Sequence, residues 1–193
     1  NTAMDGGLGD DVLLAGSGAD LLAGGAGNDT LTLGAGADIV AFNRGDGNDL
    51  VNAPLSGAGA GEKNDTLSLG GVRLSDMSLA HEGVDLVFRI VGTTDSLRLK
   101  DWYLASANQT LTKLQVVVDS TADYLPGSGD VLRAGKVATF DFSQLLGAFD
   151  AARVANPSLV NWVASDATLA AARLGSSDSL ALGGSLAYGY ASD

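Results

Sequence analysis

Five aspartates near the N-terminus recur at a nearly constant spacing, and each follows a pair of glycines. The aspartates are Asp11, Asp20, Asp29, Asp38 and Asp49. The glycines lie four and two residues before them: Gly7 and Gly9, Gly16 and Gly18, Gly25 and Gly27, Gly34 and Gly36, Gly45 and Gly47. Glycine adopts positive φ readily and can turn its carbonyl in a direction that a Cβ would oppose. Carboxylates combined with inward-turned carbonyls predict a binding site for a hard metal cation.

Calcium is the metal that this set of oxygen ligands favours. It accepts six to eight oxygen ligands in a tolerant geometry, whereas magnesium requires a strict octahedron and retains water. Zinc, copper and iron prefer nitrogen or sulfur ligands, and the chain has no cysteine and one histidine. The ligand types therefore predict Ca²⁺.

The aspartates belong to five nonapeptides, at residues 6–14, 15–23, 24–32, 33–41 and 44–52, with Phe42 and Asn43 inserted before the last copy. The eighth position of every copy is a large aliphatic residue: Leu13, Leu22, Leu31, Val40 and Val51. Each copy reads as a tight turn followed by a very short strand, and such strands become stable only when they stack. The pattern predicts a right-handed parallel solenoid with position eight in its core.

Two nonapeptides should form one coil, because the fifth position alternates between polar residues (Asp10, Asn28, Asn48) and alanine (Ala19, Ala37). Turns on the same edge then lie about 4.8 Å apart. Two bare carboxylates at that distance repel by about 3.5 kcal/mol at an effective dielectric constant of 20, so a cation is needed between them. The predicted pairs number about three to four: Asp11 with Asp29, Asp29 with Asp49, Asp20 with Asp38, and Asp38 with Asp65 if the half-coil at 64–71 retains a site.

GGLGDDVLL (6–14) and GGAGNDTLT (24–32) resemble the calcium-binding nonapeptide of RTX (repeat-in-toxin, haemolysin-type) proteins. The clear match covers residues 6–52. Two later stretches, GVDLVFRI and DSLRLKDWY, are similar to the cap segment that often follows such repeats. The resemblance implies a parallel β-roll with calcium between same-edge turns. It also implies export by a type I secretion machine that reads an uncleaved C-terminal signal.

We expect three segments in a mainly β chain: the roll at 1–55, a β-rich cap at 56–120, and a helical C-terminal region at 121–193 that includes the secretion signal. Strand-like alternation runs through 72–118, where apolar residues would plug the end of the roll: Leu86, Phe88, Leu97, Leu99, Trp102 and Tyr103. A helical hairpin is expected from helices at 143–155 and 156–175, the second with Asn156 as its N-cap and Pro157 in its first turn.

The sequence favours a binding segment over an enzyme. His81 is expected to be a solvated turn residue, and no nucleophile motif accompanies it. A formal charge of −12 argues against nucleic-acid partners, and no 18-residue apolar run predicts a transmembrane segment. Outward-facing aliphatics at position seven suggest a covered face or self-association at the cell surface: Val12, Leu21, Ile39 and Leu50.

Two functions follow from these expectations. The first is the calcium-folded tail of a large secreted bacterial surface or matrix protein, such as an adhesin. The second is the secretion and folding tail of an RTX exoenzyme or toxin whose catalytic part lies upstream of Asn1. In both, the partners are the exporter and the upstream part of the same polypeptide, and the chain is disordered in the cytosol and extracellular when folded.

Overall fold

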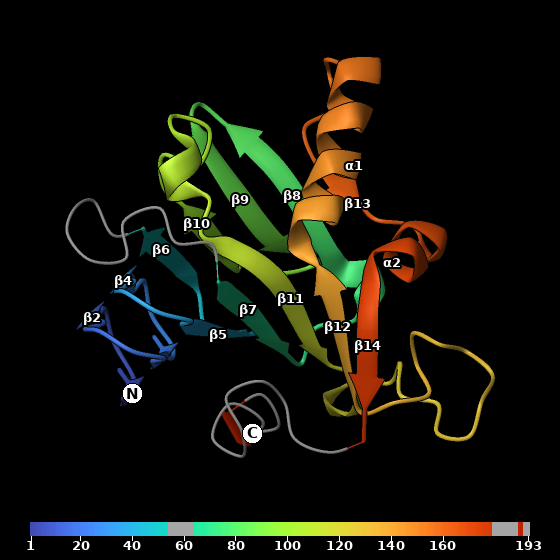
Figure 1. Cartoon of the computed structure of the whole chain (residues 1–193), viewed down its shortest axis with the longest axis horizontal. Helices are drawn as coiled ribbons and strands as arrows, with labels where there is room; N and C mark the ends of the chain where they lie inside the picture. Colours follow the sequence, from blue (N-terminus) through green and yellow to red (C-terminus); the bar gives the residue numbers. More distant parts are fainter. Residues whose placement is uncertain (54–63, 179–188, 191–193) are drawn as a thin grey trace.

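A computed structural model of the chain describes residues 1–53, 64–178 and 189–190. The described residues are mainly β and form two sheets (Figure 1). The first sheet has the order β1 (Ala3–Asp5), β3 (Leu21–Ala23), β5 (Ile39–Asn43), β7 (Asp65–Gly70), β11 (Leu111–Val117), β12 (Val137–Asp141) and β14 (Arg173–Ser177). The second has the order β13 (Trp162–Val163), β8 (Met77–Glu82), β9 (Asp85–Ile90), β10 (Ser96–Leu99), β6 (Asn48–Asn52), β4 (Thr30–Thr32) and β2 (Val12–Leu14).

The repeat strands alternate between the two sheets and pair in parallel, as the eighteen-residue period predicts. Leu21 lies opposite Ile39 in the first sheet, and Val12 lies opposite Thr30 in the second. The register grows by two residues at the next step, where Thr30 lies opposite Leu50, because Phe42 and Asn43 are inserted between them. The predicted pairing of alternate copies is therefore confirmed.

The later strands extend the same two sheets, first in parallel and then antiparallel. β7 joins β5 and β11 joins β7 in parallel, while β12 and β14 follow antiparallel. In the second sheet β10 pairs in parallel with β6, and β9, β8 and β13 follow antiparallel. Both sheets are thus mixed. All three expected segments contribute strands to one core, and the limits of those segments stay a prediction.

The core lies between the sheets and widens along the chain. The position-eight residues are buried as predicted, with at most 7% exposed: Leu13, Leu22, Leu31, Val40 and Val51. The inserted Phe42 is also fully buried and meets Phe88 edge-on, with ring centroids 6.4 Å apart. Five of the six residues expected to plug the roll are at most 3% exposed: Leu86, Phe88, Leu97, Leu99 and Trp102. The sixth, Tyr103, is partly buried and packs against the core.

The first predicted helix is present as α1 (Phe142–Ala155), which Asp141 caps by accepting the Gln144 N–H. It contacts β11 and β12 and closes the wide end of the core, where Phe142 meets Trp102. It does not overlie the repeat strands, and Val12 in β2 is 81% exposed.

The prediction of a second helix at 156–175 is wrong in its limits. The helix α2 spans only Asp166–Ala172, with Ser165 as its N-cap. The Asn156 side chain accepts the Ser158 N–H in a short turn, and Trp162 then enters β13, where its ring lies 5.8 Å from that of Phe149. Contact with the core therefore overrides the local capping signals. Residues 179–188 and 191–193, which hold most of the expected export signal, lie outside the described residues.

Candidate metal centre

One edge of the repeats stacks Asp11, Asp29 and Asp49 in a continuous ladder. The Asp11 N–H donates to Asp29 Oδ1 at 2.7 Å, and the Asp29 N–H donates to Asp49 Oδ1 at 3.0 Å. The carboxylates of Asp29 and Asp49 therefore each lie beside the turn one coil before their own. We call this ladder the odd edge, because it comprises copies one, three and five. Asp29 lies between the other two, as the predicted pairing requires.

The second carboxylate oxygens of the odd edge have no protein partner. Oδ2 of Asp11, Asp29 and Asp49 are all buried without a hydrogen bond in the described part of the chain. Burial, together with the carboxylates of Asp29 and Asp46, raises the pKa of Asp49 to about 7. An unsatisfied buried carboxylate oxygen is strongly unfavourable, and a bound cation would satisfy it. This edge therefore fits a divalent cation.

The opposite, even edge stacks Asp20, Asp38 and Asp65. Asp38 Oδ1 accepts the Asp20 N–H at 3.0 Å, and Asp65 Oδ1 accepts the Asp38 N–H at 2.9 Å. The half-coil at 64–71 thus places Asp65 on the ladder. The second oxygens of Asp20 and Asp38 accept N–H groups of Gly16 and Gly34 within their own turns. The two edges therefore differ, because Oδ2 of Asp20 and Asp38 has a backbone donor and Oδ2 of Asp29 and Asp49 has none.

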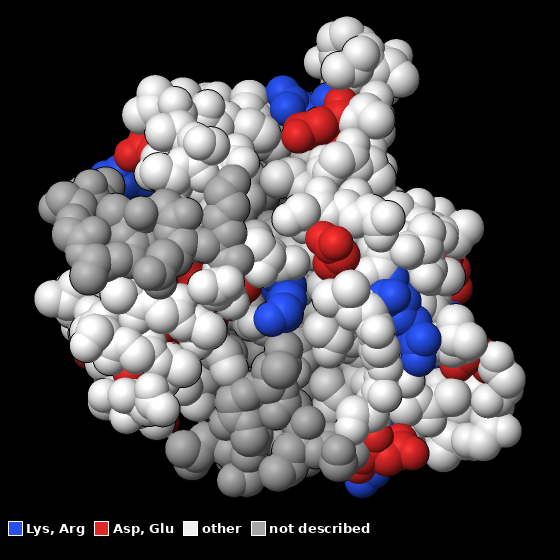
Figure 2. Space-filling model, viewed as in Figure 1, with Lys and Arg blue, Asp and Glu red and all other residues white. Residues whose placement is uncertain are grey.

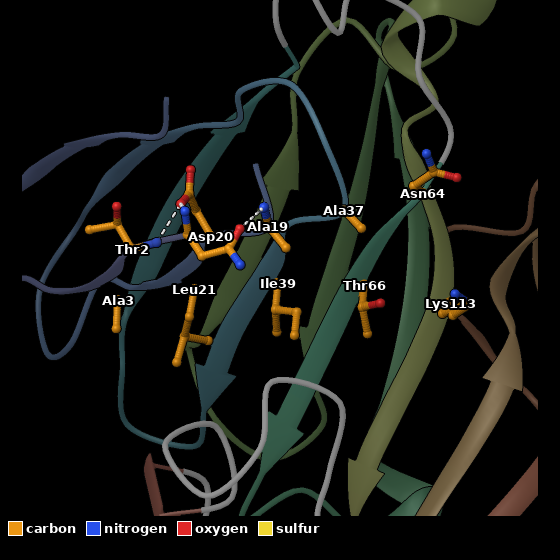
Figure 3. Close-up of a pocket in the computed structure, with 11 residues that line it drawn as sticks. Thr2, Ala3, Ala19, Asp20, Leu21, Ala37, Ile39, Asn64, Thr66 and Lys113 are labelled. Carbon is orange, nitrogen blue, oxygen red and sulfur yellow. Dashed lines mark hydrogen bonds and ion pairs between the residues drawn. The ribbon is translucent and has the colours of Figure 1, made fainter. Parts of the chain in front are cut away.

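Figure 3 shows the outer face of the first sheet beside the even edge. The Thr2 N–H donates to Asp20 Oδ1 at 2.6 Å, so the first coil continues this ladder without a carboxylate of its own. Leu21, Ile39 and Thr66 follow one another across neighbouring strands and line a cavity of about 440 Å³. Leu21 and Ile39, at position seven of copies two and four, are therefore half-buried on the outer face, whereas Thr66 is 4% exposed.

The glycines permit the close approach of successive turns. Gly25 has φ of +90°, and a Cβ on it would lie 2.0 Å from the carbonyl oxygen of Gly7 in the coil before. The same conflict, at 1.8–2.2 Å from a preceding carbonyl oxygen, would arise at Gly27, Gly34, Gly36 and Gly47. Carbonyls of one coil therefore reach the turn of the next only because side chains are missing there.

The chemistry of the ladders suits calcium better than any metal that needs a cluster of side chains. Within residues 1–53, 64–178 and 189–190, no three His, Cys, Asp or Glu side chains converge on one point. Each site would combine two stacked aspartates with carbonyls of the glycine turns. An all-oxygen set of mixed carboxylate and carbonyl donors is typical of calcium.

Sequence reasoning missed two acidic residues at the last repeat turn. Asp46 is 7% exposed, and its Oδ2 accepts the Asn43 N–H at 2.7 Å. Asp95, from the β9–β10 connection, is 8% exposed and its Oδ2 accepts the Gly45 N–H at 2.8 Å. Burial raises the pKa of Asp46 to about 6. Asp46 could have been found, because the third position of the other copies has no charged residue; Asp95 has no such signal.

Two residues that imitate functional groups have structural contacts. His81 lies in strand β8, so its expected place in a solvated turn is wrong; its Nδ1 is 2.8 Å from an Arg153 Nη2, and its ring packs edge-on against Tyr103. Asp130, in the repeat-like stretch GSGDVL, accepts the Leu132 N–H and pairs with Arg133 at 2.9 Å. Asp130 therefore contributes to a turn away from both ladders.

Part of the negative charge lies inside the molecule. Among the residues that the structure describes, seven acidic side chains are at most 8% exposed: Asp20, Asp29, Asp38, Asp46, Asp49, Asp65 and Asp95. In the view of Figure 2, red and blue side chains form small separate groups on a mostly uncharged surface. The buried carboxylates thus belong to the ladders and their surroundings.

The repeats that form these ladders match a known family of calcium-binding sequences. Residues 5–40 match the model for the RTX calcium-binding nonapeptide repeat (4 copies), which covers both edges through copy four. Residues 85–115 match the haemolysin-type calcium binding protein related domain, and they include β9, β10 and most of β11. No curated protein matches the chain. The chain therefore contains calcium-binding repeats of the RTX type, followed by a domain related to haemolysin-type calcium-binding proteins.

In the described part of the chain, no helix is both long and apolar enough to cross a membrane.

Proposed function

We propose that this chain is a calcium-dependent folding segment in which the stacked aspartates hold Ca²⁺ between same-edge turns of a right-handed parallel β-roll. The observation that carries the proposal is the odd edge, where Asp11, Asp29 and Asp49 each bury an oxygen without a partner. Bound calcium would supply positive charge between carboxylates that otherwise repel. The segment itself has no catalytic role in this proposal.

The chain's own residues account for the dependence on calcium. Without a cation, the ladder carboxylates repel, and the glycine-rich turns lose a large backbone entropy when they become ordered. The repeats then remain disordered in the cytosol, where free calcium is far below the roughly 0.1–1 mM affinities of extracellular modules. In calcium-rich surroundings, binding and folding occur together.

The wider role that we propose is the tail of a large secreted surface or matrix protein, exported by a type I machine through a signal in the C-terminal region. The exposed start of the roll supports a partner upstream in the same polypeptide, because Leu8, Val12 and Leu14 are 88%, 81% and 70% exposed. Another coil stacked there would cover part of this apolar surface. A toxin or exoenzyme tail would use the same folding chemistry.

Far-UV circular dichroism of the 193-residue chain, in EDTA and then in calcium, tests the folding role. We expect a gain of β signal with calcium and little gain with the same concentration of magnesium. Asp29→Asn should weaken the response, whereas Asp130→Asn should leave it unchanged because Asp130 lies off the ladders. A spectrum that is identical in EDTA and calcium would contradict the proposal.

Export is tested separately in the native host. Removing residues 143–193 from the full-length protein should leave it in the cytosol. Normal secretion of the truncated protein would exclude this region as the signal.

A further inference from the structure

Two residues that set the fifth repeat apart from the other four contact Tyr190, near the C-terminal end of the sequence. Asn43 belongs to the two-residue insertion, and its side-chain amide donates to the carbonyl oxygen of Tyr190 at 2.6 Å. Asp46 stands at position three, where the other copies have Leu8, Ser17, Ala26 and Ala35. The Tyr190 hydroxyl donates to Asp46 Oδ2 at 3.0 Å.

The contact is built into the odd edge itself. Asp46 Oδ2 also accepts the Asn43 N–H at 2.7 Å, so one carboxylate oxygen joins the insertion to the tyrosine. The Asp46 carbonyl accepts the Gly27 N–H at 2.8 Å, which links the third turn to the fifth. Tyr190 also lies beside the Gly25 backbone and lines a cavity of about 760 Å³. Any loss of order in these turns would therefore remove the tyrosine's partners.

We propose that the third and fifth repeat turns form a docking surface for the chain's own C-terminal end, with Tyr190 as the residue that the surface recognises. The proposal rests on the calcium-dependent folding argued above, because the surface exists only when the two turns are stacked. Tyr190 is then free while the repeats are unfolded and is held against them once calcium has bound.

The chemistry of the site favours tyrosine specifically. The hydroxyl meets a carboxylate that is 7% exposed, and hydrogen bonds to charged groups are stronger than those between neutral groups. Phenylalanine would retain the ring but leave Asp46 without this donor. Alanine at position 46 would remove the acceptor of both the Tyr190 hydroxyl and the Asn43 N–H, so Tyr190→Phe is the variant that removes the tyrosine hydrogen bond alone.

Carboxypeptidase digestion of the full chain, followed by intact mass, measures how accessible the C-terminus is. In saturating calcium the parent should resist cleavage through Tyr190, and in EDTA it should be cleaved quickly. Tyr190→Phe and Asp46→Ala should each be cleaved about tenfold faster than the parent in calcium. The matched control is Tyr103→Phe, which removes a tyrosine–aspartate hydrogen bond to Asp150 at the other end of the core and should leave protection intact.

Circular dichroism of the same samples separates the two proposals. A parent that gains no structure in calcium would contradict the folding role, and with it the calcium dependence of docking. Calcium-induced folding with equal cleavage of the parent, Tyr190→Phe and Asp46→Ala would overturn the docking surface alone. Protection of the parent that is unchanged in EDTA would show that the contact does not depend on the turns being folded by calcium.

Discussion

Neutralising Asp29 should remove more bound calcium than neutralising Asp20. Asp29 lies between two neighbours on the odd edge, since its Oδ1 accepts the Asp11 N–H and its own N–H donates to Asp49. Asp20 has a carboxylate neighbour only on one side, because Thr2 occupies the place before it. Asp29→Asn therefore affects two predicted sites and Asp20→Asn affects one. Asparagine retains the volume and one acceptor oxygen, so the comparison isolates the charge.

The size of the effect follows from binding linkage. For a site with an affinity of roughly 0.1–1 mM, 10 mM calcium adds about 1.4–2.7 kcal/mol to the free energy of unfolding. Losing two such sites should thus cost about 3–5 kcal/mol, against about 1.4–2.7 kcal/mol for one. Thermal unfolding in 10 mM calcium measures the difference, and calorimetric titration counts the ions. Equal losses of ions and stability in the two variants would refute the pairing.

Two further predictions concern the turns and the closed end of the core. Gly25→Ala should destabilise the calcium-loaded chain much more than Gly7→Ala. Both glycines have positive φ, which costs an alanine about 1–2 kcal/mol, but only at position 25 would the added Cβ meet a carbonyl oxygen. Equal melting temperatures of the two variants would contradict this. Burial and the neighbouring Arg153 lower the pKa of His81, so the folded state binds the proton more weakly than the unfolded state does. The free energy of unfolding should therefore fall as the pH drops below about 6.5. In saturating calcium, His81→Gln should lose less stability than the parent between pH 7 and pH 5, and identical pH profiles would show that His81 is not responsible.

The repeat half of the fold could be predicted because its information is local and periodic. The alternation of Asn28 with Ala19 and Ala37 was enough to pair copies one with three and two with four, which the strand register confirms. The aliphatic at position eight identified the core side of each strand. Even the half-coil containing Asp65 carried enough of the pattern to place it on the even edge.

The remainder depends on contacts that no local pattern records. Asn156 and Pro157 are good signals for a helix start, yet pairing of Trp162 with Leu79 takes this stretch into a strand. Nothing near Asp95 in the sequence indicates that it will accept a hydrogen bond from Gly45, 50 residues earlier. Tyr190 and Asp46 are 144 residues apart, so their contact could be found only from the folded chain. Calcium binding by the individual aspartates stays a prediction.

Strand length increases from the first coil toward β11 in the first sheet, and from β2 to β6 in the second. β2, β3 and β4 each have three residues, β5 and β6 have five, β7 has six and β11 has seven. Longer strands bring more interstrand hydrogen bonds and more enclosed apolar surface, so local opening should become rarer along the stack. Amide hydrogen exchange should accordingly be slow in β7 and β11, and fastest in β1 and β2. Local stability should therefore increase along the stack, with the long strands supporting the pairing of the shorter ones. The first coil should open most often, because its residues Val12 and Leu14 are largely exposed.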